Sequence, residues 1–203
     1  MPARVSPPPS PSCAWRPVQR DASLPARQGG SFTSTRGVIF TSALTKFSLS
    51  PGSLMHAVPG DRVVLPSPNG SAISHEAVGF GDVVAGCLRN ARAVAKFIAS
   101  RGYPVAIVVA GERWSDGSLR PAIEDVLGAG AIVSMLDSTC SPEARGAAAA
   151  FENMRGNLLG ALRGSSSGRE LVGRGFDSDV TIAAELDATE TVPLLADGYF
   201  RAA

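Results

Sequence analysis

The sequence predicts an α/β protein, a three-layer α/β/α sandwich with a mainly parallel sheet. Short apolar runs alternate with stretches of helical periodicity, and this alternation implies parallel strands joined by right-handed crossovers. The run V-A-I-V-V-A at 105–110 is apolar throughout, which is typical of a strand covered on both faces. With 203 residues, of which 44% are hydrophobic, the chain can bury one sizeable core.

The first half of the pattern follows a loop with a short turn at 47–54. A strand is predicted at 62–66, where three apolar residues run into turn chemistry, and Ser71 is placed as the N-cap of a helix over 72–80. A strand at 82–86 precedes a helix over 88–100, which Gly102 ends. That helix places apolar residues at helical spacing, namely Ala91, Val94, Ala95 and Ile98.

The second half begins with the strand at 105–110. A long helix is predicted over 120–136, with Pro121 at its first position and acidic residues in its first turn. Another long helix is predicted over 142–163, and shorter ones near 168–172 and 178–186. The 142–163 helix turns one apolar face inward, formed by Phe151, Met154, Leu158, Ala161 and Leu162.

The first 46 residues differ from the rest in charge and composition. They hold six basic residues and one acidic residue, whereas the remainder holds 13 basic and 17 acidic residues. The proline-rich start cannot form a helix or a central strand, and only 37–44 resembles a strand. We therefore expect a disordered or aberrant segment at 1–46 and a folded domain at 47–203.

Composition argues against several function classes. A formal net charge of +1 argues against nucleic-acid binding, and the absence of an 18-residue apolar run argues against a membrane span. Three cysteines without a C-x-x-C pair suggest neither a disulfide framework nor a zinc site, so a cytoplasmic location is expected. No P-loop, dinucleotide fingerprint or G-x-S-x-G elbow occurs.

Three loops should lie at the carboxyl ends of the predicted strands, where α/β sheets bind ligands. The first is S-P-N-G-S, formed by Ser67, Pro68, Asn69, Gly70 and Ser71. Its free backbone N–H groups at a helix start could bind an anion. The same residues equally suit a simple strand-to-helix turn with an N-cap.

The second loop, at 87–90, offers one basic and one amide side chain. Arg89 could reach a phosphate or carboxylate, and Asn90 could cap the helix or bind a ligand. A solvated first helical turn explains the same residues. Cys87 is expected to be a small buried residue rather than a nucleophile, because no histidine is positioned to activate it.

The third loop, at 111–118, is flanked by carboxylates. Glu112 follows the apolar strand, and Glu124 and Asp125 stand near the start of the next helix. Hard oxygen ligands of this kind suit magnesium. Acidic residues are also common at helix starts because they interact favourably with the helix dipole, so a structural role stays open. Asp137 is a further candidate for this magnesium site.

Several segments together resemble the 2-phosphosulfolactate phosphatase family, the ComB-like proteins. The resemblance covers about residues 47 to 200 and rests on six segments in the family's order. They are F-S-L-S-P-G-S-L (47–54), V-V-L-P-S-P-N-G-S (63–71), A-G-C-L-R-N-A (85–91), A-G-E-R-W-S-D-G-S-L-R-P-A-I-E-D-V-L-G-A-G-A (110–131), S-S-G-R-E-L-V-G-R-G-F-D-S-D-V (166–180) and V-P-L-L-A-D-G-Y-F (192–200).

The resemblance implies a magnesium-dependent phosphatase that converts a 2-phospho-hydroxyacid, such as 2-phosphosulfolactate, to the hydroxyacid and phosphate. It implies Asp125, Glu124 and Asn69 as catalytic residues, and Glu112, Glu124 and Asp125 as Mg²⁺ ligands. The implied substrate-binding residues are Ser67, Gly70, Ser71, Arg89, Asn90, Arg120 and Arg169. The partner would be a small phosphorylated acid, and a homodimer is possible.

The sequence departs from the family pattern before Phe47. The family's first strand ends in Asp-x-x-Arg-Ala-Thr/Ser-Thr, and no such motif precedes Phe47. We therefore expect a domain that is incomplete on its N-terminal side and less stable than a complete relative. The alternatives are a catalytically inactive remnant that binds an anion or a partner, and a transferase that uses a phosphorylated substrate.

Overall fold

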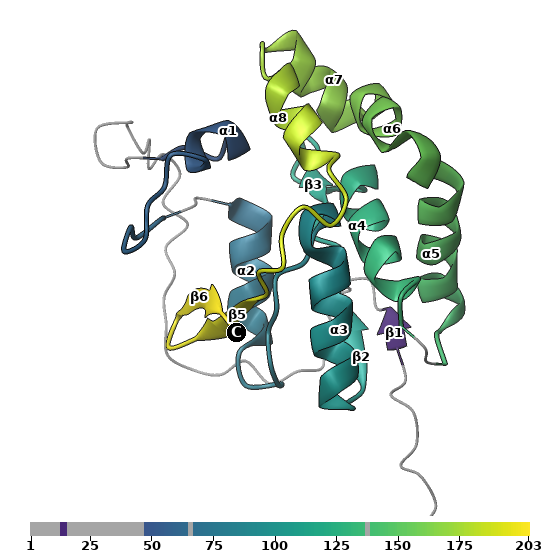
Figure 1. The fold of residues 1–203 in the computed structure, drawn as a ribbon. Coiled ribbons are helices and arrows are strands. Elements are labelled where there is room, and N and C mark those ends of the chain that lie inside the picture. The colour runs from purple at the N-terminus through teal and green to yellow at the C-terminus, as the bar shows by residue number, and fades with distance from the viewer. Residues whose placement is uncertain (1–12, 16–46, 65–66, 137–138) are drawn as a thin grey trace, which may run out of the picture.

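The computed structural model describes residues 13–15, 47–64, 67–136 and 139–203 (Figure 1). Helices make up about half of the described chain, and the strands form three two-stranded sheets. The prediction of an α/β protein is confirmed in this general sense. Among the described residues, no helix is long and apolar enough to cross a membrane.

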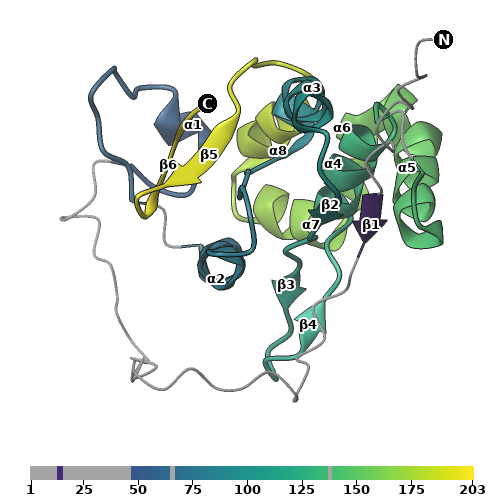
Figure 2. The same cartoon turned by 90° about the horizontal axis from the view of Figure 1, so that it is seen from below.

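The three sheets are small, and only one of them is parallel. β1 (Cys13–Trp15) runs parallel to β2 (Val105–Ile107), and Figure 2 shows this pair beside α4 (Ile123–Val133) and α5 (Pro142–Met154). The other four strands form two antiparallel hairpins, β3 (Glu112–Arg113) with β4 (Leu119–Arg120) and β5 (Pro193–Ala196) with β6 (Tyr199–Ala202).

The predicted three-layer sandwich with a mainly parallel sheet is therefore not found in the described residues. The predicted strand at 62–66 is not one over its described part, where Val63 and Val64 are 40% and 61% exposed. A strand requires a neighbour for its N–H and C=O groups, and apolar sequence alone does not supply one. The predicted strand at 82–86 contributes only one bridging residue, Val84, which pairs antiparallel with Leu194.

The C-terminal hairpin explains that bridge. Asp197 and Gly198 connect β5 to β6 with φ angles of 51° and 85°, the conformation of a tight two-residue turn. On its other side β5 bonds the 83–85 segment, where Ala85 N donates to Pro193 O at 3.0 Å and Leu195 N donates to Val83 O at 2.9 Å. The neighbour of 82–86 is thus the far end of the chain.

The helices match the predictions more closely than the strands do. Predicted helices at 88–100, 120–136, 168–172 and 178–186 are found with shifted ends. The elements are α1 (Pro51–Leu54), α2 (Pro68–Ala77), η1 (Leu88–Asn90), α3 (Ala91–Arg101), α6 (Leu158–Gly164), α7 (Ser166–Gly173) and α8 (Asp177–Ala183), in addition to α4 and α5. Gly102 ends α3 in the left-handed conformation, as expected (φ 67°).

Two helix predictions need correction. The helix predicted over 142–163 is broken by η2 (Arg155–Asn157), because Asn157 Oδ1 accepts from Gly160 N at 3.1 Å and caps a new helix. The helix predicted over 72–80 begins earlier, at Pro68. Its N-cap residue is Ser67 and not Ser71, since proline suits the first helical position.

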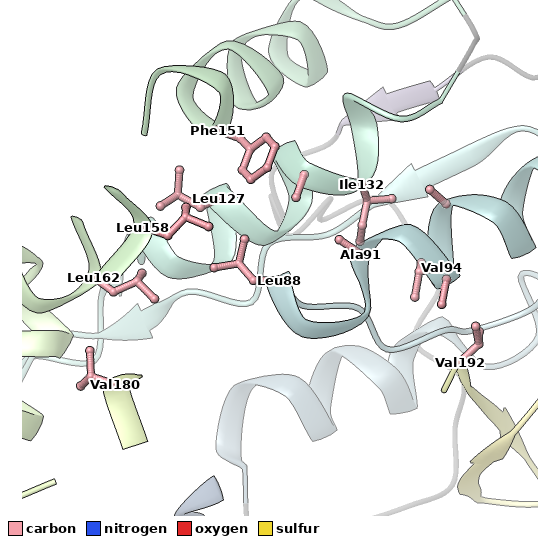
Figure 3. Close-up of a cluster of buried hydrophobic side chains, with 13 residues drawn as sticks. Leu88, Ala91, Val94, Leu127, Ile132, Phe151, Leu158, Leu162, Val180 and Val192 are labelled. Carbon is pink, nitrogen blue, oxygen red and sulfur yellow. The ribbon is translucent and has the colours of Figure 1, made fainter. Parts of the chain in front are cut away.

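The core lies between α3, α4, α5 and α6, with α8 and the C-terminal segment at its edges. Figure 3 shows its side chains, among them Leu88, Ala91, Val94, Leu127, Ile132, Phe151, Leu158, Leu162, Val180 and Val192. Leu127 and Ala131 of α4 are fully buried. Helix α4 lies close against α5 at Gly130, where an added Cβ would lie 2.7 Å from the Ala147 carbonyl carbon.

Most of the N-terminal segment lies outside the described residues. Only β1 is described within 1–46, and its pairing with β2 was not expected from the sequence. The possible strand at 37–44 and the candidate Asp137 both lie outside the described residues. The division of the chain at residue 46 stays a prediction.

Candidate functional site

Gly111 joins three of the predicted site segments. Its carbonyl oxygen accepts a hydrogen bond from Asn69 Nδ2 at 2.8 Å, and its N–H donates to Asp125 Oδ2 at 2.7 Å. Its φ of 68° favours glycine, and a Cβ would lie 2.9 Å from Leu119 Cδ1 and 3.2 Å from Arg120 O. The first turn of α2, the start of α4 and the β3–β4 hairpin therefore meet at one residue.

Asn69 is held at both ends of its amide group. Its Nδ2 donates to Gly111 O, and its Oδ1 accepts from Arg113 Nε at 3.2 Å. Arg113 also donates through Nη1 to Gly117 O at 2.8 Å, inside the same hairpin. The sequence reasoning did not single out Arg113, although it lies within the third loop. It is the arginine that contacts Asn69 directly.

Ser67, Gly70 and Ser71 form the first turn of α2 rather than an open anion loop. The N–H and the hydroxyl of Ser71 both donate to Ser67 O. Gly70 lies close to the Ser67 side chain, whose Oγ would be 3.2 Å from a Cβ added there. Ser67 makes no side-chain capping bond within the described structure. The N–H groups at this helix start carry the positive end of the helix dipole.

Three carboxylates concentrate negative charge beside Gly111. Burial raises the pKa of Asp125, the Gly111 N–H lowers it, and the charges of Glu124 and Glu112 raise it further. Glu124 Oε2 is buried and accepts no hydrogen bond from any described residue. A buried oxygen without a donor, next to a second carboxylate, is an arrangement that a cation would stabilise.

The described residues nevertheless contain no group of three His, Cys, Asp or Glu side chains placed to hold a metal ion. Glu112, Glu124 and Asp125 interact through their charges but do not converge on one point. A magnesium ion is commonly held by one or two carboxylates together with water and substrate phosphate. Two carboxylates meet that smaller requirement, and Glu124 and Asp125 are neighbours at the start of α4. Glu112 stays a predicted ligand.

Arg120 is buried beside this acidic region and is bound by a carboxylate from α7. It is 9% exposed, and its Nη1 and Nη2 donate to Glu170 Oε1 and Oε2 at 2.6 and 3.2 Å. The Trp114 ring lies against the guanidinium, with 5.4 Å from Cζ to the ring centroid. The hydrogen bonds from Arg120 lower the pKa of Glu170, and those to Glu170 raise the pKa of Arg120.

The remaining predicted residues have structural partners away from Gly111. Arg89 donates to Ile182 O at 2.9 Å and pairs with Glu185. Arg169 donates to Gly164 O at 2.6 Å. Both arginines therefore hold helix ends together in this structure.

The buried side chain of Asn90 binds three backbone groups around its loop. It is 4% exposed, accepts from Cys87 N at 2.8 Å, and donates to Ala85 O and Thr191 O at 3.2 and 3.1 Å. Its bond to Cys87 N caps the start of η1, whereas its side chain makes no capping bond to α3. Cys87 itself is exposed, so the expectation of a buried residue is wrong.

Asp179 is a buried charged residue that the sequence reasoning missed. It is 6% exposed and accepts from Ser50 Oγ at 2.8 Å and from Gly52 N at 3.3 Å. These bonds attach α1 to α8. The paired acids of D-S-D at 177–179 gave no indication of which one is buried.

Comparison with known proteins agrees with the six segments. Residues 43–198 match the family model described as 2-phosphosulpholactate phosphatase. A 2-phosphosulfolactate phosphatase of Methanothermobacter thermautotrophicus is 34% identical over 139 residues, 68% of this chain and 58% of the relative.

Two proteins named probable 2-phosphosulfolactate phosphatase give similar values. That of Deinococcus radiodurans is 36% identical over 147 residues, 70% of this chain and 59% of the relative. That of Gloeobacter violaceus is 31% identical over 140 residues, 67% of this chain and 56% of the relative. The matched region thus spans less than two thirds of the length of these relatives. Taken with the match over 43–198, these identities show that the chain belongs to the 2-phosphosulpholactate phosphatase family.

Proposed function

We propose that the protein is a magnesium-dependent phosphatase that hydrolyses a 2-phospho-hydroxyacid, such as 2-phosphosulfolactate, to the hydroxyacid and phosphate. The observation that carries this proposal is the pair of hydrogen bonds at Gly111, which connects Asn69 at the start of α2 to Asp125 at the start of α4. An amide, a helix start and a carboxylate would then face one reaction centre in a chain of the phosphatase family.

The start of α2 would bind the phosphoryl group. Phosphate suits a helix N-terminus because backbone N–H groups and the helix dipole both favour negative charge there. Arg113 would add a cation to this side, since only its Nε and Nη1 donate to described residues, and its remaining N–H groups can donate to an oxygen of the ligand. Asn69 would fix the distance between the helix start and the carboxylates.

Glu124 and Asp125 would hold Mg²⁺. When bound, the ion would polarise the phosphoryl group and favour deprotonation of an attacking water. The buried Oε2 of Glu124 and the burial that raises the pKa of Asp125 support this assignment, because a cation would stabilise carboxylates that are charged away from water. Asp125 would also keep Gly111 in place through its Oδ2, so one side chain would serve both ion and backbone.

The test is phosphate release from a panel of 2-phospho-hydroxyacids, including 2-phosphosulfolactate, with and without Mg²⁺. We expect magnesium-dependent release by the chain. Asp125→Asn should lower turnover by about a hundredfold or more, because positioning and charge neutralisation supply most of the catalysis of phosphoryl transfer. Glu152→Gln, a change on the exposed face of α5, is the matched control and should leave turnover unchanged. Unchanged turnover in Asp125→Asn would remove that residue from the site.

An independent measurement tests the metal site. At an Mg²⁺ concentration ten times its Kd, binding should raise the free energy of unfolding by about 1.4 kcal/mol. That increase should disappear in Glu124→Gln and persist in Glu152→Gln. An equal effect of Mg²⁺ on all three proteins would contradict the assignment of Glu124.

One observation favours the alternative of a remnant that binds anions without catalysis. The described residues place no three metal-binding side chains together. A remnant of this kind would bind phosphate or a phosphorylated acid and release no phosphate from any substrate of the panel. The release assay therefore separates the two functions.

A further inference from the structure

The guanidinium of Arg120 is held in the geometry by which proteins bind anionic ligands. Two parallel N–H···O bonds connect it to the Glu170 carboxylate. The two side chains are buried very differently, since the side chain of Arg120 alone is 11% exposed and that of Glu170 is 59% exposed. The arginine is thus built into the protein, and the carboxylate reaches it from the solvent side.

Three arginines act electrostatically on the Glu170 carboxylate, and one of them, Arg120, contacts it. Besides Arg120, the charges of Arg174 and Arg169 also lower the pKa of Glu170. All three groups are arginines, whose planar guanidinium suits carboxylate, sulfonate and phosphate groups. The carboxylate of Glu170 therefore lies where an anionic group of a ligand would be bound if Glu170 were absent.

The backbone of Arg120 adjoins the proposed reaction centre, and the charges of Glu112 and Glu124 act on its guanidinium. Arg120 lies opposite Glu112 in the β3–β4 ladder, and its carbonyl oxygen would be 3.2 Å from a Cβ on Gly111. Gly111 in turn binds Asn69 and Asp125. A phosphorylated acid with its phosphate at the start of α2 would carry its second acidic group toward this side of the hairpin.

We propose that Glu170 occupies, in the free protein, the position on Arg120 that the second acidic group of the substrate takes on binding. The group would be a carboxylate or a sulfonate, and its entry would displace Glu170 toward solvent. This inference rests on the proposed function. It makes Glu170 an internal competitor that weakens the binding of acids with two anionic groups and leaves simple phosphate esters unaffected.

A positioning role for Glu170 would change the affinity for these acids in the opposite direction. If Glu170 only oriented Arg120 for the ligand, its removal would leave a mobile guanidinium and weaken the binding of the same acids. Loss of a competitor strengthens binding, and loss of a positioning residue weakens it. The direction of the change in affinity therefore decides between the two roles.

The experiment measures the Kd of two probes by isothermal titration calorimetry on the full chain with Mg²⁺. The probes are 2-phosphoglycolate, which has a phosphate and a carboxylate, and methyl phosphate, which has the phosphate alone. Glu170→Gln should bind 2-phosphoglycolate about fivefold more tightly, because a charge-assisted pair no longer competes for Arg120. Methyl phosphate should bind within about twofold of the wild-type affinity, since solvent screens the lost charge.

Two further variants complete the design. Glu152→Gln removes a carboxylate from an exposed pair with Arg155 and should change neither Kd. Arg120→Met should abolish the gain caused by Glu170→Gln when the two changes are combined. Thermal melts verify folding, and Glu170→Ala replaces Glu170→Gln if the latter does not fold.

The outcomes distinguish this inference from the proposed function. Unchanged or weaker binding of 2-phosphoglycolate by Glu170→Gln overturns the inference alone, provided that the wild type binds methyl phosphate. Equal tightening for both probes also overturns it, because the effect would then be one of general charge. Failure of the wild type to bind either probe counts against the proposed function and the inference together.

Discussion

Gly130 in α4 offers a direct test of the packing between α4 and α5. A methyl group added there would lie against the backbone carbonyl of Ala147, with 2.7 Å to its carbon and 2.9 Å to Phe151 Cβ. These are backbone and Cβ atoms, which no rotamer change can move. Gly130→Ala therefore requires the two helices to separate.

The magnitude follows from two opposing effects. Overpacking a close core contact costs about 1–3 kcal/mol, here at the upper end because a backbone group must shift. Alanine is a better helix former than glycine by about 1 kcal/mol, which offsets part of that cost. We expect a net loss of about 2 kcal/mol in the free energy of unfolding, which lowers Tm by about 4–8 °C for a chain of this size.

Gly146 in α5 is the matched control. It is exposed, and a Cβ there would have nothing within 4 Å among the described atoms. Gly146→Ala should gain the helix-forming effect alone and stabilise the protein by up to about 1 kcal/mol. Urea unfolding followed by circular dichroism measures both variants. Stabilisation by both alanines would refute the reasoning, because it would show that α4 and α5 do not meet at Gly130.

Three other predictions concern the core, the phosphate side and the Arg120 pair. Leu127→Ala should lower the free energy of unfolding by about 3 kcal/mol, since it empties a fully buried site, and a loss below about 1 kcal/mol in urea unfolding would contradict that burial. Arg113→Ala should weaken the binding of methyl phosphate about fivefold in calorimetry, whereas Arg155→Ala should not; equal effects would remove Arg113 from the site. The Arg120 hydrogen bonds lower the pKa of Glu170 below its ordinary 4.5, so the pair stabilises the protein above that pH and ceases to do so as the pH falls through the lowered pKa. The free energy of unfolding of the wild type minus that of Glu170→Gln should accordingly be largest near neutral pH and shrink in acid, and a difference independent of pH would contradict the ion pair.

Helical periodicity predicted the helices well because each helix satisfies its own backbone. The apolar positions Ala91, Val94 and Ala95 are buried as the spacing predicted. The break at Asn157 was missed, although asparagine is one of the favoured N-cap residues. Helix boundaries depend on single capping side chains, and the spacing of apolar residues carries no information about them.

Strands were predicted less well because a strand depends on a partner elsewhere in the chain. The apolar residues Val63 and Val64 suggested a buried strand, but no described segment pairs with them. The Asp-Gly pair at 197–198, between two apolar runs, is a strong hairpin signal and was not used. Pairing between 83–85 and β5 joins residues whose proximity no local pattern encodes.

The candidate site could also be predicted only in part: its residue types could be selected from the sequence, but the contacts between them could not. The third loop and the acidic start of α4 could be selected from the sequence because the residue types themselves suit a phosphate and a cation. The connection of Asn69 to Asp125 through Gly111, and of Arg120 to Glu170, depends on the tertiary fold. Arg89 and Asn90 have suitable chemistry for a ligand, but the fold uses them to join helices and loops.

The pairing of β5 with the 83–85 segment has a kinetic consequence. Val84 and Leu194 are about 110 residues apart in the chain, and the helices from η1 to α8 lie between them. Closing so long a loop is slow and entropically unfavourable until the intervening helices have packed and shortened the distance. The C-terminal hairpin should therefore dock last during refolding and open first in native-state hydrogen exchange, so that the amides of Ala85 and Leu195 exchange before those of α4.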